Sequence, residues 1–478
     1  MRIVQTFWTA GQDPLKHAYG WLHPEYNLMS WALSCLSLRE HYDEVALYTD
    51  SEGKRILIDE LHLPYTEVNV VFDDFLCLPQ HWALAKIKTY SLQTKPFLHV
   101  DGDVYVSQPF SEEILTAPLV AQNREIGTGY YRQMIDDLLI HEELIIPDHI
   151  KKVISKESIS SYNMGVFGGN DLYSIHSYCK EVFSFIERNR MNDIRCSNSG
   201  ISCNVFFEQI WLAAWSETNN KEVSGLINHP VMDNGYTIHE FCDLDRYENN
   251  RCFHLLGGHK KNKEVISMLE RALIRFFPDI YLHILYFFPE KHYRLSLSNP
   301  IYSTWLSAEQ SLAQYVDFLA VQEEKWRSLN TEEIFLLERK AANSVYFLKL
   351  PKEERNICML ERNPYLSLFE IPQDWNPWTK EQIWDRLSHE GKKQFNMIAI
   401  TPSMAQKGIK ETALSAVCKI MLNILDGVVL TYEEFQDKLI LMLGINKNNT
   451  VQDCITDCFC TEFKNLINNG IIIIKKSK

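Results

Sequence analysis

Two kinds of apolar pattern alternate through the first part of the chain. Runs that are apolar throughout or at every second residue are typical of strands, and apolar residues three and four apart are typical of helices. The pattern predicts strands over 2–8, 44–49, 67–72, 97–100, 119–122, 162–170, 223–232 and 251–256. It predicts helices over 24–36, 55–63, 82–92, 171–190, 203–217 and 263–277. This alternation favours an α/β fold with parallel strands and crossover helices.

The alternation ends near Pro289, and the rest of the chain predicts a mostly α-helical region. Residues 300–345 and 412–425 have helical spacing, and Thr431-Tyr-Glu-Glu is a capping signal for another helix. A last predicted helix, 451–468, precedes the apolar run 471–474. Three helices and a terminal strand predict a winged-helix-like module. We therefore expect an α/β domain over 1–290, a helical accessory region over 291–394 and the winged-helix-like module over 395–478.

Composition narrows the class of protein. A chain of 478 residues exceeds one ordinary core, and its 46% hydrophobic and 23% charged residues are typical of globular proteins. The net charge of −14 disfavours binding to nucleic acid or to an anionic membrane surface. No run approaches the roughly 18 apolar residues of a membrane span. The start lacks the apolar core of a secretory signal and the 12 cysteines lack paired spacing, so we expect a cytoplasmic protein with reduced thiols.

The candidate chemistry centres on two carboxylates, Asp101 and Asp103, which follow the apolar run that begins at Phe97. Ligands of open α/β sheets bind at the carboxyl ends of the strands, and Gly102 would let a ligand approach the backbone closely. Carboxylates suit Mg²⁺ or Mn²⁺, ions that usually hold a substrate diphosphate. Asp-Gly-Asp is also a common surface turn, but the apolar runs on both sides argue against that alternative.

Four segments resemble the retaining glycosyltransferases of the glycogenin and bacterial galactosyltransferase family (family eight), which have the GT-A fold. Three segments match short motifs of that family, and the fourth is a basic residue one helix before the metal motif. The segments are Lys86, Asp101-Gly-Asp103, Tyr162-Asn163-Met-Gly165 and Phe253–Lys260, the last matching His-x-x-Gly-x-x-Lys at His254, Gly257 and Lys260. They span roughly the first 275 residues.

The resemblance implies a GT-A domain that binds a nucleotide sugar, most simply a UDP-hexose, and transfers the hexose with retention to an unknown acceptor. Asp101, Asp103 and His254 would hold Mn²⁺ or Mg²⁺. The donor would contact residues on both sides of the metal. These donor-binding residues are Lys86, Lys260, Gly257 and Gly258 at the phosphates, with Thr6, Phe7 and Trp8 at the nucleotide base.

Three residues would complete the site near the sugar. Glu208 and Gln209 stand where the family has an acid and a glutamine close to the anomeric carbon, and Asn163 belongs to its Asn-x-Gly strand. Each candidate also has a structural alternative. His254 and the first-strand aromatics could be core residues, Lys86 a solvated helix residue, Glu208-Gln209 a polar helix stripe and Asn163 a strand cap.

The chain departs from the family pattern at Lys261-Asn262, where the family has Pro-Trp, and at Ile210, where it has a second acid. Other functions are therefore kept open. One is a catalytically degenerate GT-A-like protein that binds a protein or peptide through its C-terminal module, which in an active enzyme could dock the acceptor. Another is a haloacid-dehalogenase-type phosphatase, although Tyr105 stands where that class has Thr or Val. A third is a nucleotidyltransferase, but that class usually has a Gly-rich, basic loop after the first strand, and residues 9–14 are poor in glycine and in basic residues.

Overall fold

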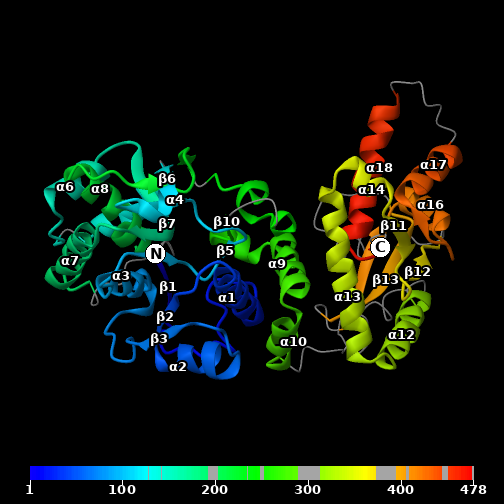
Figure 1. Ribbon diagram of the computed structural model, residues 1–478, viewed down its shortest axis with the longest axis horizontal. Coiled ribbons are helices and arrows are strands. Elements are labelled where there is room, and N and C mark those ends of the chain that lie inside the picture. The colour runs from blue at the N-terminus through cyan, green and yellow to red at the C-terminus, as the bar shows by residue number, and fades with distance from the viewer. Residues whose placement is uncertain are drawn as a thin grey trace. The chain divides into compact units, whose positions relative to one another are not determined.

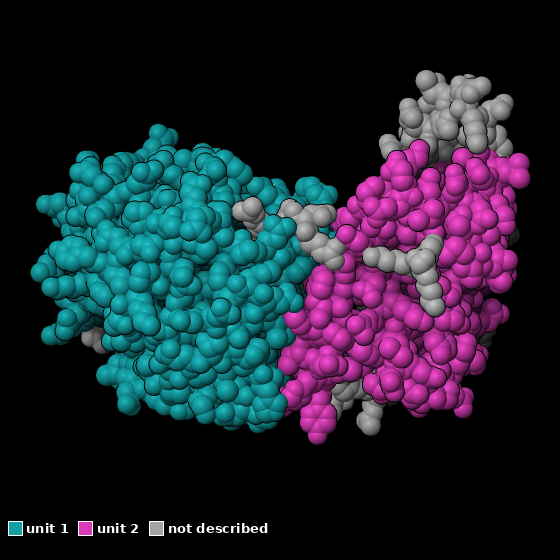
Figure 2. All heavy atoms as spheres, in the orientation of Figure 1, with its two compact units in different colours: residues 1–269 teal, residues 270–478 magenta. Residues whose placement is uncertain are grey.

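The computed structural model of the chain consists of two compact units, Met1–Leu269 and Glu270–Lys478 (Figures 1 and 2). Each unit is treated by itself. The unit boundary lies within one helix, α9 (Lys263–Phe276), and the expected boundary was at 290. The structure describes residues 1–127, 129–141, 143–191, 203–233, 235–247, 252–288, 313–372, 395–404, 408–443 and 451–475.

A mixed sheet forms the centre of the first unit, with strand order β3-β2-β1-β4-β7-β6-β8 and β9 beside β6. Its strands are β1 (Arg2–Phe7), β2 (Val45–Thr49), β3 (Glu67–Val70), β4 (Phe97–Val100), β6 (Val120–Gly127), β7 (Ile159–Gly169), β8 (Ser224–Gly225) and β9 (Val231–Met232). The strands β3, β2, β1 and β4 are parallel, which confirms the predicted α/β class. The strand β7 runs antiparallel to both β4 and β6, a feature that the pattern did not indicate.

Helices cover both faces of this sheet because successive strand residues point to opposite faces. On β1, Ile3 packs into one core and Val4 into the other; on β4, Leu98 and Phe97 divide in the same way. The larger core lies beneath α3 and α7, seen together in Figure 1. The helices are α1 (Pro24–Arg39), α2 (Ser51–Lys54), α3 (Ala83–Ser91), α4 (Glu112–Thr116), α5 (Gly129–Leu139), α6 (Asp148–Ile154), α7 (Leu172–Arg188) and α8 (Trp211–Thr218).

Two predicted helices contain π-helical turns. Arg55–Glu60 continues α2 as a π-helix, and Phe206–Ile210 is a π-helix that leads into α8. Single π-turns within α-helices are uncommon and often lie at functional sites. The second turn carries Glu208 and Gln209, so its wide geometry bears on the candidate site.

A two-stranded ribbon beside the sheet joins distant parts of the sequence. β5 (Val104–Val106) pairs antiparallel with β10 (Cys252–His254), and His254 lies opposite Val104. The N–H of Leu255 donates to the carbonyl oxygen of Asp103 at 3.0 Å. The ribbon therefore places His254 beside the Asp-Gly-Asp turn, about 150 residues earlier in the chain.

In its described part, the second unit combines its helices with two sheets, of which the pattern predicted only the terminal strand. Its sheets have the orders β15-β11-β16 and β12-β13-β14. The strands are β11 (Met359–Arg362), β12 (Ser367–Glu370), β13 (Met397–Ser403), β14 (Gly408–Leu414), β15 (Leu430–Thr431) and β16 (Ile472–Lys475). Both sheets join strands from either side of residue 394, so the two expected C-terminal regions share a hydrophobic core.

The described helices of this unit are α10 (Pro278–Tyr286), α12 (Ala313–Arg327), α13 (Thr331–Val345), α14 (Lys352–Asn356), α16 (Ala416–Ile424), α17 (Tyr432–Met442) and α18 (Val451–Asn468). All of them except α10 and α14 fall in predicted helical regions. The Thr431 capping box is confirmed, because Thr431 and Glu434 exchange side-chain to backbone hydrogen bonds. The predicted start of a helix at Thr412 was wrong: Thr412 lies in β14, and Ser415 caps α16. Residues 300–312 of the first predicted helical region lie outside the described residues.

Over the described ranges, no helix combines the length and apolar character that a membrane crossing requires.

Asp50 fixes the loop that follows β1. One oxygen, Oδ2, accepts hydrogen bonds from the Thr9 N–H at 2.8 Å and the Thr9 hydroxyl at 2.7 Å. The other, Oδ1, accepts from the Gly53 N–H at 2.8 Å and caps α2. The buried carboxylate therefore ties the ends of β1 and β2 together.

We expect Asp50→Asn to lower the free energy of unfolding by about 2 kcal/mol, because the amide nitrogen must face one of these three donors. Chemical denaturation of the full chain measures the loss. Asp59→Asn is the matched control, since Asp59 is exposed and pairs only with Lys54, a surface contact of little energy. Equal stability of the two variants would contradict this role of Asp50.

Candidate metal and ligand-binding site

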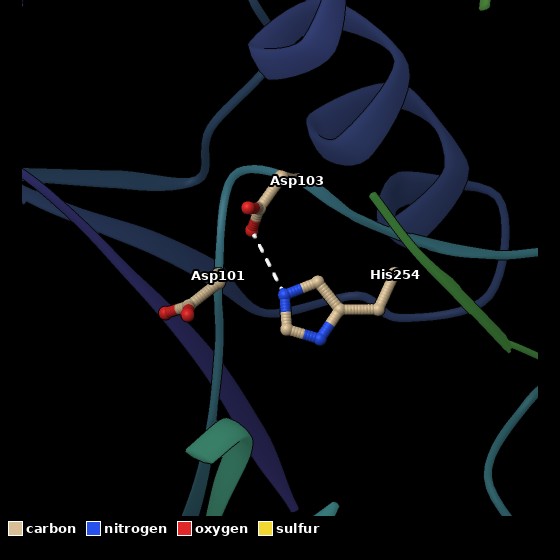
Figure 3. A group of neighbouring side chains, drawn as sticks. All are labelled: Asp101, Asp103 and His254. Atoms are coloured by element: carbon tan, nitrogen blue, oxygen red, sulfur yellow. Dashed lines mark ion pairs between the residues drawn. The ribbon is translucent and has the colours of Figure 1, made fainter. Parts of the chain in front are cut away.

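Asp101, Asp103 and His254 form a cluster at the carboxyl end of β4. Each offers one ligand atom, and these three atoms all lie within 4.8 Å of one another. The Asp101 N–H donates to the Gly165 carbonyl oxygen at 2.8 Å, which joins the turn to β7. Figure 3 shows the imidazole turned toward Asp103, with His254 Nε2 and Asp103 Oδ1 3.5 Å apart. Two carboxylates and an imidazole are a donor set that fits Mn²⁺ and, with weaker preference, Mg²⁺.

A hydrogen-bond chain determines which imidazole nitrogen faces the carboxylates. The Gln122 side-chain amide donates to Asn123 Oδ1 at 3.1 Å, so its oxygen Oε1 is directed toward His254. That oxygen lies 2.7 Å from His254 Nδ1 and accepts its proton. On this assignment Nε2 carries a lone pair and faces Asp103. Two facing acceptors require a second proton or a cation between them, and an imidazole oriented by a polar partner is typical of metal ligands.

Glycine at position 165 makes room for this arrangement. A Cβ at residue 165 would lie 2.5 Å from His254 Cε1 and 2.6 Å from Gln122 Oε1. The Asn-x-Gly motif is therefore explained by packing against the imidazole. Gly102 has a different neighbour from the one expected, because a Cβ there would lie 2.5 Å from the indole of Trp31.

Lys86 joins a partly buried carboxylate, Asp101, to a buried one, Glu208. Its Nζ lies 2.9 Å from Asp101 Oδ1 and 2.8 Å from Glu208 Oε1, and it also donates to the Met164 carbonyl at 3.3 Å. Its side chain is only 7% exposed. Lys86 therefore offsets part of the negative charge of Asp101 and Glu208, and its expected contact with a donor molecule stays a prediction.

Lys260 is the second cation of the site. Its Nζ lies 2.6 Å from Asp103 Oδ2 and 5.6 Å from the centre of the Trp21 ring. It stands at the end of a short 3₁₀ turn, Gly257–Lys261, that begins with Gly257 at φ +54°. A Cβ at Gly257 or Gly258 would meet no atom within 4 Å, so this turn borders open space.

The two aspartates have different protonation equilibria. Burial raises the pKa of Asp101 to about 6, although the Lys86 ammonium opposes the change. Burial acts in the same direction on Asp103, but the Lys260 ammonium group outweighs it and holds the pKa of Asp103 well below its usual range. Asp103 is therefore the carboxylate that stays ionised over the whole physiological range. Burial opposes the charge of Lys86, yet Asp101 and Glu208 raise its pKa above the ordinary value.

Glu208 and Gln209 lie on the π-helical turn but differ in their surroundings. Glu208 is 1% exposed and accepts a hydrogen bond from the Tyr90 hydroxyl at 2.9 Å in addition to its ion pair with Lys86. Gln209 is half-buried and lines the cavity described below. Within the described ranges, no residue forms a hydrogen bond with the Gln209 amide, so this group is available to a ligand.

Asn163 belongs to a buried polar network that the sequence did not indicate. Its Oδ1 accepts from the Gly165 N–H at 2.9 Å, and its Nδ2 donates to Glu125 at 3.2 Å and to the Tyr236 hydroxyl at 3.0 Å. Glu125 also accepts hydrogen bonds from Tyr131 and Tyr236. This environment makes Asn163 a positioning residue for β7. Gln122 and Glu125 were missed because a polar residue within a strand has no pattern that reveals its partner.

One cavity of about 1100 Å³ brings every sequence-predicted site residue together. The predicted residues in its lining are Thr6, Phe7, Trp8, Lys86, Asp101, Asp103, Asn163, Glu208, Gln209, His254, Gly257, Gly258 and Lys260. Tyr19, Trp21, Trp31 and Trp82 add aromatic surface. This volume is at the upper end of small-molecule sites.

The three base-site candidates on β1 have different surroundings. The Thr6 hydroxyl donates to Thr89 at 2.7 Å and lies 3.0 Å from His99 Nε2. Phe7 is buried, with its ring 4.9 Å from that of Trp31. Trp8 is half-buried and packs edge-on against Phe75. Trp8 therefore offers a more open aromatic surface than Phe7.

The chain belongs to a family of unknown function (DUF6734), whose model matches residues 1–287. That range contains the whole cavity and both segments of the metal cluster. A comparison with curated proteins gives no match.

We expect Gly165→Ala to lower the affinity for Mn²⁺ about 10- to 100-fold, because the new methyl group displaces His254 and its Gln122 partner. Electron paramagnetic resonance of unbound Mn²⁺ measures the affinity, and a melting curve checks the fold. Gly129→Ala is the control, since a Cβ at Gly129 meets no atom within 4 Å. Unchanged Mn²⁺ affinity in Gly165→Ala would show that His254 does not serve as a ligand.

Proposed function

We propose that the first unit is a metal-dependent glycosyltransferase of the GT-A type that uses a nucleotide sugar, with a UDP-hexose as the donor. One observation carries the proposal: Asp101, Asp103 and His254 converge on the wall of a cavity large enough for a nucleotide sugar. The strand order with β4 beside β1 and the resemblance of the motifs support the same class. The family has no established function, so the site itself supplies the argument.

The protein groups around the cluster have distinct proposed roles. Asp101, Asp103 and His254 would hold Mn²⁺ or Mg²⁺, which would neutralise charge on the departing diphosphate. Lys260 supplies a further positive charge beside Asp103. The available amide of Gln209 is placed to orient the sugar or the acceptor. Glu208 and Asn163 position their neighbours, since both are held by bonds within the protein.

The reaction that we propose is transfer with retention, and this part rests on the resemblance. The bond between the anomeric carbon and the diphosphate oxygen breaks, and a bond to the acceptor oxygen forms on the same face of the sugar. The proton of the acceptor hydroxyl passes to the departing diphosphate. The acceptor is unknown.

The second unit is proposed to dock an acceptor protein or peptide. Helices α16, α17 and α18, followed by β16, have the order expected for a winged-helix-like module, which β11 completes by pairing with β15 and β16.

We expect UDP or a UDP-hexose to raise the melting temperature of the full chain in Mn²⁺ but not in EDTA. A ligand that binds only the folded state at 100 times its dissociation constant adds about 2.7 kcal/mol to the free energy of unfolding. Asp103→Asn should abolish the shift, and the exposed Asp59→Asn should retain it. ADP and GDP serve as comparison nucleotides.

Failure of every nucleotide to stabilise the protein, with or without metal, would overturn this proposal. A metal-dependent shift without release of UDP from any UDP-hexose would instead favour the catalytically degenerate alternative. A coupled assay of UDP release distinguishes the two results.

A further inference from the structure

Lys260 occupies an unusual position for a residue that binds a diphosphate. In this structure its ammonium group forms a 2.6 Å ion pair with Asp103, one of the three candidate metal ligands. Both side chains are largely shielded from water, with 21% and 12% of their surfaces exposed. Charge-assisted hydrogen bonds in such surroundings are among the stronger polar contacts. A divalent cation at Asp103 must therefore compete with Lys260 or share the carboxylate with it.

The charges around the cluster make a cation alone unfavourable. Asp101, Asp103 and Glu208 supply three negative charges, and Lys86 and Lys260 supply two positive charges. A divalent ion alone would reverse the sign of this group, within reach of two ammonium groups. A divalent ion that arrives with a diphosphate adds no net positive charge and gives Lys260 another anion to pair with.

The surroundings of Lys260 contain further groups suited to an anion. The carbonyl oxygen of Lys260 accepts the Leu22 N–H at 3.2 Å, so the residue adjoins the start of the 16-residue helix α1. Asn27 lies in the first turns of α1, is 2% exposed and lines the cavity. Its Nδ2 has no hydrogen-bond acceptor among the described residues. A buried donor without an acceptor costs free energy, and a phosphate oxygen would satisfy it.

We propose that Lys260 is an internal competitor of the metal, which holds Asp103 in the ligand-free protein and releases it when a diphosphate offers another anion. The site then binds a divalent cation tightly only together with a diphosphate. This inference deepens the proposed function and rests on it for the nature of that ligand pair.

Lys86 does not have this role, although it also contacts a metal ligand. Its ammonium group is held by Asp101, Glu208 and the Met164 carbonyl at once, and its side chain is more deeply buried. Lys260 instead ends a turn whose two glycines border open space. Only Lys260 therefore has the freedom to exchange one anion for another.

Equilibrium dialysis of the full chain tests the proposal, with total manganese measured on both sides of the membrane and inorganic pyrophosphate as the anionic probe. In the wild type, saturating pyrophosphate should raise the affinity for Mn²⁺ about tenfold or more. Lys260→Met should bind Mn²⁺ alone about tenfold more tightly than the wild type, because the competing charge is gone. The enhancement by pyrophosphate should shrink in this variant.

Three further variants make the result specific. Lys260→Arg keeps the charge and should retain weak binding of Mn²⁺ alone, while Lys260→Gln removes the charge with a polar side chain and should behave as Lys260→Met. Lys261→Met removes an exposed neighbouring charge and should behave as the wild type. The proposal is overturned if neither neutral variant at residue 260 binds Mn²⁺ alone more tightly than the wild type, or if Lys261→Met does so equally.

The outcomes separate this inference from the proposed function. Tighter binding of Mn²⁺ alone in Lys260→Met, without stabilisation by any nucleotide, would support the inference and reject the donor class. Stabilisation by UDP with Mn²⁺, but no gain in the neutral variants, would reject the inference alone. Absence of Mn²⁺ binding in every variant would reject both.

Discussion

The gathering of three carboxylates in one cavity wall, with Glu208 buried and Asp101 and Asp103 partly buried, is the constraint on which the site depends. An uncompensated buried charge costs several kcal/mol, so Asp101, Asp103 and Glu208 can share this wall only with cations beside them. Lys86 compensates two of them, and Lys260 compensates the third. Removing Lys86 alone would leave the buried Glu208 without a countercharge, a change that destabilises the fold. The same lysines that offset these acids therefore also determine the charge that a divalent ion would meet in the cavity.

The cluster also depends on long-range strand pairing. β4 delivers Asp101, and the β5–β10 ribbon delivers His254 from a distant part of the sequence. The side chain of Gln122, on β6, then selects the imidazole tautomer, and Gly165, on β7, leaves space for both. Four separate segments thus determine which nitrogen of the His254 imidazole faces the two carboxylates. The geometry cannot form until the central sheet is complete, which makes the site a property of the whole first unit.

The sequence predicted those parts of the molecule that local pattern controls. The strands around Val4, Leu47 and Leu98 have apolar periodicity, and the capping box at Thr431 has a local signature, so both were confirmed. The residues of the site were predicted from short motifs, and the structure brings them to one cavity. Their roles stay predictions.

Features that depend on tertiary partners were not predicted. Three such features arise from packing between distant segments. Lys86 pairs with Glu208, Gln122 bonds to His254, and the Trp31 indole fills the space beside Gly102. The sheets of the second unit were not predicted, for a related reason. Residues 412–414, at the start of a predicted helix, suit a helix locally, but pairing with β13 makes them the end of β14.

The two lysines of the site differ in how many acceptors hold each ammonium group. Both are ammonium groups within 3 Å of a metal-ligand carboxylate. Lys86 is fixed by three acceptors and serves as a permanent countercharge, which permits an acid with a pKa of about 6 to remain beside the cluster. Among the described residues Lys260 has one carboxylate partner, and it lies in a glycine-containing turn, so its charge would be available for exchange. A site that held both lysines rigidly would repel a divalent ion, and one that held neither would leave its acids unpaired. One fixed and one exchangeable cation satisfy both requirements.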